Sequence, residues 1–246
     1  MIKKLLPALV VVATAFLSGC QHDDGNEIYS HDSMFFIDYR HLGGGKDGMA
    51  VIELDPESAD FGHISSKLEL GEGVLPHHIY YDYFEQRLYT TALGGSYLYQ
   101  IKTVEDANGL PTLVSANPID TKGNTVGEDI FFTSDGRYFV TFMGGDGTPK
   151  GGSVGVFNAY TNKHIRTISG SINDNPNKFI MYPHGISVSE EKGLMMVTST
   201  IHPDLTTGVG NTCTLIDLNT YQMIETYTVA DSPSDLSSPV EVLLLR

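Results

Sequence analysis

The sequence predicts an all-β fold made of repeated antiparallel sheets. Helical periodicity is nearly absent, whereas short runs rich in β-branched and aromatic residues recur along the chain. Turn signals such as SDG, EKG and GGS separate these runs. The pair Asp135-Gly136 within FFTSDGRYFVTF is a good hairpin signal, because both residue types tolerate a positive φ angle.

Three units of similar sequence begin at Pro76, Gly127 and Pro183. Each unit predicts a strand, a tight turn, a second strand, a loop, a third strand, a turn and a fourth strand. When the units are aligned, His77, Glu128 and His184 occupy one slot, at steps of 51 and 56 residues. Four strands per unit at a period near 50 residues is typical of β-propeller blades.

The two ends of the repeat region are partial. Residues 34–70 predict the second, third and fourth strands of a further blade, and the terminal SPVEVLLLR (238–246) fits an inner strand with Val240 in the slot of His77. That strand could complete the N-terminal blade and close a four-bladed ring. Alternatively, the chain is part of a longer propeller. The second interpretation is favoured, because an exposed apolar terminal strand would promote aggregation.

The N-terminus predicts a lipoprotein signal. Lys3 and Lys4 precede the apolar run LLPALVVVATAFL, which is too short to span a bilayer comfortably, and the run ends in LSGC. This arrangement resembles the lipobox of bacterial lipoproteins, in which the cysteine becomes the lipidated N-terminus. The predicted organisation is a signal peptide (1–19), lipidated Cys20 with a polar tether to residue 33, and a propeller domain (34–246). Gln21 after the cysteine favours the outer membrane, facing the periplasm or the cell surface; an ordinary secretory signal is the alternative.

The charge balance limits the classes of partner. The sequence has 15 basic and 30 acidic side chains, and removal of residues 1–19 with their two lysines would leave a net charge of −17. Such a surface repels phosphate backbones, so no nucleic-acid partner is expected. Membrane attachment is expected through the acyl anchor on Cys20. Cys213 would then be the remaining cysteine, with no disulfide partner in the chain, and its strand-like surroundings favour a buried structural residue over a reactive thiol.

Histidines gather at one predicted location. In a propeller blade, a residue just before the first strand and a residue just after the second strand lie at the same mouth of the central channel. His77, His78 and His184 have the first kind of position, and His41 and His202 have the second. Glu128 and Asp129 fill the first kind of position in the blade between. Five of the nine histidines are therefore expected at one end of the channel.

Imidazole and carboxylate groups that converge in this way suit a transition metal, with copper or zinc preferred by nitrogen-rich sites. The alternative is that these histidines only form hydrogen bonds at the starts of strands. Clustered histidines would also suit acid–base or pH-sensing roles.

Several stretches resemble the selenium-binding protein and methanethiol oxidase family. FMGGDGTPKGGSVGVFNAYTNKHIRTISG is similar to the family's glycine-rich loop, strand and D-x-x-T turn. MVTSTIHPDL, CTLIDLNTYQMIETYTV and SPVEVLLLR resemble its stretch from SSEW through NPEL and WDL to PLEV. The likeness covers residues 125–246. It implies a seven-bladed propeller and, for enzymatic members, copper-dependent oxidation of methanethiol by dioxygen to formaldehyde, hydrogen sulfide and hydrogen peroxide.

His184 and His202 lie within the region of resemblance, which implies that they are possible metal ligands. His77 and His78 are predicted as ligands from the repeat alone. The chain has no Trp for the SSEW motif and no cysteine matching the family's proposed selenium site, so selenium binding is not expected. The first functional hypothesis is a metal-dependent oxidase of small thiols, with Glu128 or Asp129 transferring protons. The second is a non-catalytic propeller lipoprotein that binds a protein or small ligand, and the third is a metal-dependent lyase or lactonase. No feature of the sequence identifies a protein partner.

Overall fold

The protein forms four antiparallel β-sheets. The computed structural model describes residues 34–107, 110–144, 151–169, 180–201, 209–232 and 237–243, and these residues contain strands but no helix. The first sheet has three strands: β1 (Met34–Tyr39), β2 (Lys46–Glu53) and β3 (Ile64–Glu72). The remaining strands form three sheets of four: β4 (Pro76–Asp82), β5 (Arg87–Ala92), β6 (Leu98–Glu105) and β7 (Pro111–Pro118); β8 (Gly127–Phe132), β9 (Arg137–Phe142), β10 (Ser153–Asn158) and β11 (His164–Ser169); β12 (Pro183–Ser189), β13 (Leu194–Ile201), β14 (Val209–Asp217) and β15 (Met223–Thr228).

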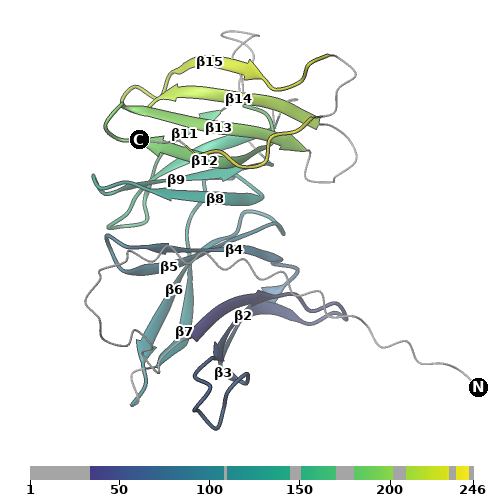
Figure 1. The fold of residues 1–246 in the computed structure, drawn as a ribbon, viewed down its shortest axis with the longest axis vertical. Coiled ribbons are helices and arrows are strands. Elements are labelled where there is room, and N and C mark those ends of the chain that lie inside the picture. The colour runs from purple at the N-terminus through teal and green to yellow at the C-terminus, as the bar shows by residue number, and fades with distance from the viewer. Residues whose placement is uncertain are drawn as a thin grey trace, which may run out of the picture.

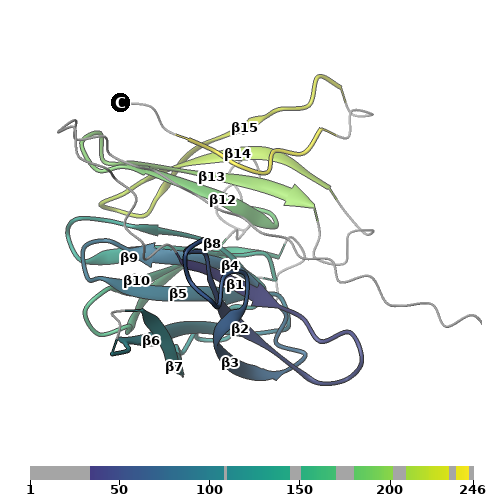
Figure 2. The ribbon, with the colours of Figure 1, turned by 60° about the horizontal axis from the view of Figure 1, so that its bottom comes forward.

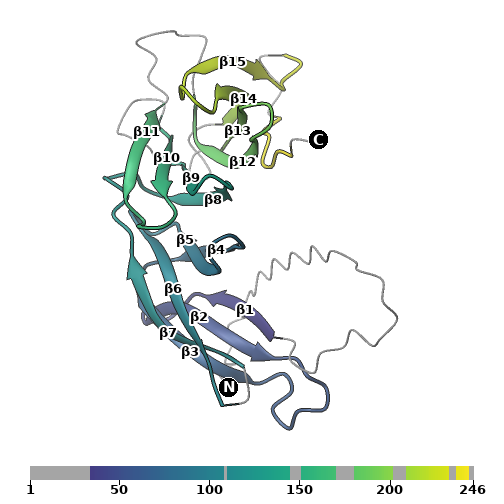
Figure 3. The same ribbon diagram turned by 90° about the vertical axis from the view of Figure 1, so that its left-hand side faces the viewer.

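The sheets are successive blades of a β-propeller, as the repeat predicts. Within each sheet the strands lie in chain order and every neighbouring pair is antiparallel. The blades are stacked one after another (Figures 1 and 2), from β1–β3 to β12–β15. Figure 3 shows that they follow an open arc, with β1, β4, β8 and β12 on its concave side. In the part of the chain that is described, no helix is long and apolar enough to cross a membrane.

The first blade has the three strands that the sequence predicts. In the described residues, β1 pairs with β2 and with no other strand. Residues 237–243 do not form the expected strand and do not pair with β1. Instead, the carbonyl oxygen of Val240 accepts hydrogen bonds from Gly185 N of β12 and Thr198 Oγ1 of β13. The closed four-bladed ring is therefore not observed.

The hydrophobic core is divided into three layers, each between two adjacent blades. Large side chains that are fully buried mark them: Met49 and Val51 between the first and second blades, Phe142 between the second and third, and Phe139 and Met195 between the third and fourth. Because both faces of the middle sheets are covered, their second strands, RLYTTA and RYFVTF, are buried at every residue after the initial arginine. Each layer holds the start of one inner strand close to the next.

The turns follow local sequence signals. Gly136 has a φ of 81° in the hairpin between β8 and β9, which confirms the predicted Asp-Gly turn. In the third and fourth blades, the turn after the third strand begins with a polar residue whose side chain caps it. Asn158 Oδ1 accepts hydrogen bonds from Thr161, and Asp217 Oδ1 accepts the equivalent bonds from Thr220.

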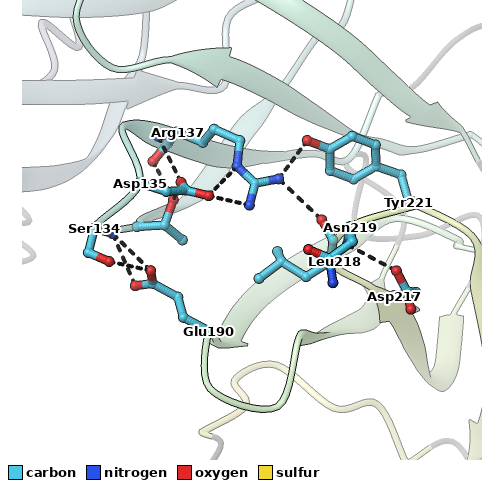
Figure 4. A network of polar contacts seen from close by, with 9 residues as sticks. Ser134, Asp135, Arg137, Glu190, Asp217, Leu218, Asn219 and Tyr221 are labelled. Carbon is cyan, nitrogen blue, oxygen red and sulfur yellow. Dashed lines mark hydrogen bonds and ion pairs between the residues drawn. The ribbon is translucent and has the colours of Figure 1, made fainter.

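A polar network joins the third and fourth blades at the end of the inner strands away from Pro183 (Figure 4). The guanidinium of Arg137 donates hydrogen bonds to Asp135 in its own turn, to Leu218 O and to the hydroxyl of Tyr221 in the next blade. A charged donor with several acceptors holds a well-defined geometry. The network therefore fixes the angle between these two blades.

A second contact joins the same two blades, and a related one joins the second and third blades. Between the third and fourth blades, Ser134 donates from its backbone N and its hydroxyl to the carboxylate of Glu190, which lies in the turn after β12. Arg87, which corresponds to Arg137 in the previous blade, donates to Ala159 O and Tyr160 O. Two consecutive blade interfaces are thus clamped by an arginine at the same repeat position.

Candidate metal centre

Each four-stranded blade begins with a one-residue β-bulge in its inner strand. In β4 the pairing changes from Pro76↔Ala92 to Ile79↔Thr90, so β4 has one more residue than β5 over this interval. The starts of β8 and β12 show the same irregularity. A bulge changes the direction in which side chains point, and bulges are frequent next to functional sites.

The extra residues are the ones aligned from the sequence. The bulge of β4 contains His77 and His78, the bulge of β8 contains Glu128 and Asp129, and the bulge of β12 contains His184 and Gly185. Since the three inner strands are neighbours on the concave side of the arc, these bulges face a common region (Figure 3).

Three imidazoles surround one carboxylate oxygen. Glu128 Oε2 lies 3.1 Å from His77 Nε2, 3.4 Å from His78 Nε2 and 3.5 Å from His184 Nε2. One ligand atom from each of the four residues lies within 4.8 Å of those of the other three. The rings of His77 and His78 are 4.0 Å apart at their centroids, and those of His78 and His184 are 5.9 Å apart and nearly perpendicular.

Several polar atoms of the cluster are buried without a regular hydrogen bond. These atoms are Glu128 Oε2, His78 Nε2 and His184 Nδ1. Only 3% of the Glu128 side chain is exposed, so its carboxylate has little access to water. A buried carboxylate without compensation is unfavourable, which indicates that the cluster has a further partner or shares protons internally.

Glu128 is ionised at neutral pH, as a metal-binding carboxylate must be. Burial alone would raise its pKa, but the adjoining imidazoles of His77 and His78, together with the charge of His184, lower the pKa to about 2. Burial would lower the pKa of His184, yet the contact with Glu241 and the charge of Glu128 raise it. The cluster therefore keeps a carboxylate charge at neutral pH and attracts positive charge.

The donor set fits a transition metal ion. In a tetrahedral site with bonds of about 2.0–2.1 Å, neighbouring ligand atoms lie about 3.3–3.4 Å apart. The three separations between Glu128 Oε2 and the imidazole nitrogens are close to this value. Imidazole nitrogen with one carboxylate oxygen is a donor set for Zn²⁺ or Cu²⁺. His77, His78, Glu128 and His184 could therefore hold a metal.

A second group of side chains lies around the cluster. The side chain of Glu241 approaches His184, with Oε1 3.3 Å from Nδ1. Asp129 accepts a hydrogen bond from Ile186 N, and the nearby Tyr80 acts to lower the pKa of Asp129. Burial raises the pKa of Asp129, and it also raises the pKa of Tyr80 well above its usual value. In the first blade, burial raises the pKa of Asp38 to about 6, although the nearby charge of His78 opposes this shift.

Of the residues predicted from the sequence, His77, His78, Glu128 and His184 are brought together. Asp129 is adjacent, but its carboxylate accepts a hydrogen bond from Ile186 N and is not one of the four clustered ligand groups. The exposed ring of His41 is not part of the cluster; it lies against the turn at residues 43–45, where Nδ1 accepts a hydrogen bond from Gly43 N. His202 is outside the described residues, as is Cys20.

Glu241 and Asp38 were not predicted as part of the site. A signal for Glu241 existed, because it follows Val240 just as His78, Asp129 and Gly185 follow the aligned slot. The remaining cysteine, Cys213, is half-buried on β14, and burial raises the pKa of its thiol, as expected for a structural residue.

Comparisons with known proteins establish the fold alone. No family model and no curated protein matches the sequence. A hypothetical selenium-binding protein from Sulfolobus tokodaii has a similar structure, with a TM-score of 0.60 and 15% identity over 76% of this chain and 46% of that chain. Hydrazine synthase from Kuenenia stuttgartiensis has a TM-score of 0.50 and 10% identity over 74% and 43%.

A periplasmic gluconolactonase from Pseudomonas aeruginosa also matches, with a TM-score of 0.48 and 13% identity over 83% of this chain and 54% of that chain. The chain thus spans about half the length of these three structures. The first of them shares the β-propeller fold, which is the fold that the sequence resemblance implies.

Proposed function

We propose that this protein is a copper-dependent oxidoreductase of the cell envelope that oxidises small thiols. The observation that carries the proposal is the set of three imidazole nitrogens within 3.5 Å of the buried Glu128 carboxylate oxygen. The thiol substrate is supported by the resemblance of residues 125–246 to methanethiol oxidases. Copper is supported by the donor set, because N and O ligands bind Cu²⁺ more tightly than the other divalent ions of the first transition row.

The reaction that the resemblance implies is a two-electron oxidation. Methanethiol, dioxygen and water give formaldehyde, hydrogen sulfide and hydrogen peroxide; the carbon loses two electrons and dioxygen gains them. Bound copper would supply the redox centre. His77, His78, Glu128 and His184 would hold it, with the thiol approaching from the mouth of the channel.

Glu128 and Asp129 have different roles, one as a metal ligand and the other in proton transfer. Glu128, with a pKa of about 2, is a weak base and is suited to remain a ligand. Burial raises the pKa of Asp129, although the nearby Tyr80 opposes this shift, and the raised pKa makes Asp129 the better acceptor for the proton of a thiol. This assignment selects Asp129 over Glu128 as the proton-transfer group.

The location in the cell envelope follows from the predicted signal and the lipidation of Cys20. Acyl chains would hold the strongly acidic domain at a membrane surface whose anionic lipids would otherwise repel it. The proposed site at the outer membrane would expose the channel to small molecules of the periplasm or the exterior.

The first test is the metal content of the purified full chain, beside the variants His184→Ala and His63→Ala. His63 is an exposed histidine away from the cluster and serves as the control. We expect about one copper per chain in the parent and in His63→Ala, a lower content in His184→Ala, and release of hydrogen sulfide from methanethiol by the copper-loaded protein. A folded parent chain without bound copper would contradict the proposal.

A non-catalytic binding propeller is the second candidate, and one feature favours it. Tyr83 and Phe84, in the turn after β4, are 73% and 58% exposed, and exposed aromatic side chains are frequent in protein interfaces. Loss of a crosslinked partner on replacing both residues with serine, in a protein without copper, would support this function instead.

A further inference from the structure

We infer that Glu241 is a positioning residue that holds His184 in the tautomer with its proton on Nδ1, so that the Nε2 lone pair faces the metal centre. The inference rests on the proposed metal binding and names a residue that the ligand set does not include. Glu241 Oε1 is 3.3 Å from His184 Nδ1, on the side of the ring opposite to Glu128.

The two ends of the His184 ring compete for one proton when the ring is neutral. Nε2 faces Glu128 Oε2 at 3.5 Å, and Nδ1 faces Glu241 Oε1 at 3.3 Å. Glu128 Oε2 is also approached by His77 at 3.1 Å, a shorter contact than the one it makes with His184. Glu128 therefore has a closer proton donor in His77 than in His184. Nδ1 of His184, in contrast, is buried and has no regular hydrogen bond in the described part of the chain. A proton on Nδ1 satisfies that atom through Glu241.

The backbone places Glu241 for this task. Val240 O accepts hydrogen bonds from Gly185 N and Thr198 Oγ1, which fixes the segment one residue before Glu241. A Cβ atom on Gly185 would lie 2.7 Å from Val240 O and 2.9 Å from Glu241 Cα, so a larger residue would push the segment away. The glycine at position 185, next to His184, therefore leaves the space that Glu241 needs to approach the ring.

A carboxylate that accepts the second N–H of a histidine ligand fixes the ring orientation and makes the other nitrogen more basic. Loss of such a partner typically lowers metal affinity by about 10- to 100-fold. Glu241 can have this effect although 66% of its side chain is exposed, because the nitrogen that it faces is buried.

The test uses the full chain and the variants Glu241→Ala, Glu241→Gln and Glu191→Ala. Glu191 is an exposed glutamate in the turn at the other end of β12, so its replacement removes the same charge from the same blade. The first measurement is nitrogen-15 NMR of the His184 ring in the metal-free protein at pH 9, which identifies the nitrogen that carries the proton. We expect Nδ1–H in the parent, in Glu191→Ala and in Glu241→Gln, whose amide oxygen can accept the bond, and a shift towards Nε2–H in Glu241→Ala.

The second measurement is Cu²⁺ affinity by competition with a chelator. We expect a loss of about 10- to 100-fold in Glu241→Ala, a smaller loss in Glu241→Gln and none in Glu191→Ala. An unchanged tautomer in Glu241→Ala overturns the inference, and so does a changed tautomer with unchanged affinity. If the parent binds no Cu²⁺ but the tautomer still depends on Glu241, the proposed metal function fails while the orientation of His184 by Glu241 stands.

Discussion

His184 and Val240 hold the same place in consecutive blade positions. The carbonyl oxygen of His184 accepts a hydrogen bond from Thr141 Oγ1 at 2.6 Å, and that of Val240 accepts one from Thr198 Oγ1 at 2.7 Å. Each threonine hydroxyl also accepts a bond from the backbone of its own inner strand. In the third and fourth blades, the threonine on the second strand therefore links the bulge of its own blade to the aligned residue of the next blade position. Thr91, at the same position in the second blade, has no such bond in the described part of the chain, so the link sets the spacing between Glu128 and His184 but not that between His77 and Glu128.

Replacement of Thr141 by valine tests this link. The variant keeps the shape of the side chain but leaves Asp129 N and His184 O without their shared partner. We expect the free energy of unfolding to fall by about 1–3 kcal/mol, as for other buried groups that lose a hydrogen bond, and the affinity for Cu²⁺ to fall as well. Urea denaturation and metal competition measure the two effects. Thr103→Val, on the exposed part of β6, should change neither.

Two glycines beside the centre should differ in their tolerance of alanine. At Gly185 a Cβ would meet Val240 O at 2.7 Å, whereas at Gly127 the nearest atoms belong to Phe142 and Thr91 at an ordinary 3.5 Å. We expect Gly185→Ala to lower the free energy of unfolding by about 1–3 kcal/mol, in the range of overpacked sites, and to weaken metal binding. Gly127→Ala should stay within about 0.5 kcal/mol of the parent. Equal effects in urea denaturation would show that the approach of the 237–243 segment to β12 is unimportant.

The pH dependence of stability should include a contribution from Asp38. Its folded-state pKa is about 6 because the carboxyl is partly buried, so between about pH 4 and 6 the unfolded chain loses this proton before the folded chain does. Stability from this group therefore falls as the pH rises through that window.

Asp38→Asn removes this fall. Relative to the parent, the variant should gain about 1 kcal/mol at pH 7.5, since solvent screens part of the effect, and little at pH 4. Urea denaturation of the metal-free protein at both pH values is the measurement. Asp60→Asn, in an exposed turn, is the control for loss of charge. A gain of the same size at both pH values would rule out the ionisation of Asp38 as the cause.

The arginine clamp between the third and fourth blades should contribute to stability. Arg137→Met keeps much of the aliphatic stem but removes the hydrogen bonds to Asp135, Leu218 O and Tyr221 (Figure 4). We expect a loss of about 1.5–3 kcal/mol in the free energy of unfolding, the range for hydrogen bonds to charged groups. Lys192→Ala, which removes an exposed positive charge from the β12–β13 turn, should have little effect. Similar losses in the two variants would point to net charge rather than to the clamp.

Much of the fold could be predicted from the sequence because the unit repeats. The alignment of His77, Glu128 and His184 is confirmed by the identical bulge at the start of β4, β8 and β12. The three-stranded first blade is also as predicted. The prediction for the terminal residues was only partly right: Val240 has the aligned slot, but residues 237–243 form no strand because no neighbouring strand pairs with them in the described part of the chain.

The candidate site was less accessible to prediction. We expected residues just before first strands and just after second strands to converge. His77, His78 and His184 do converge, whereas the ring of His41, which was expected with them, lies over its own turn. Position along a strand limits where a side chain starts, whereas its direction depends on the bulge and on the turn that follows. Glu241 was missed because its role depends on an approach to His184 across 57 residues of chain.

The sequence specified the strands, their grouping into blades and the residue types at each inner slot, because these features depend on local periodicity and on spacing within a unit. The distances within the His–Glu cluster, the proximity of Tyr80 to Asp129 and the contact between Glu241 and His184 came from the three-dimensional arrangement. They depend on the curvature of the blade stack and on the angle of each bulge. Those quantities arise from packing between blades and are not encoded in the spacing of residues along the chain.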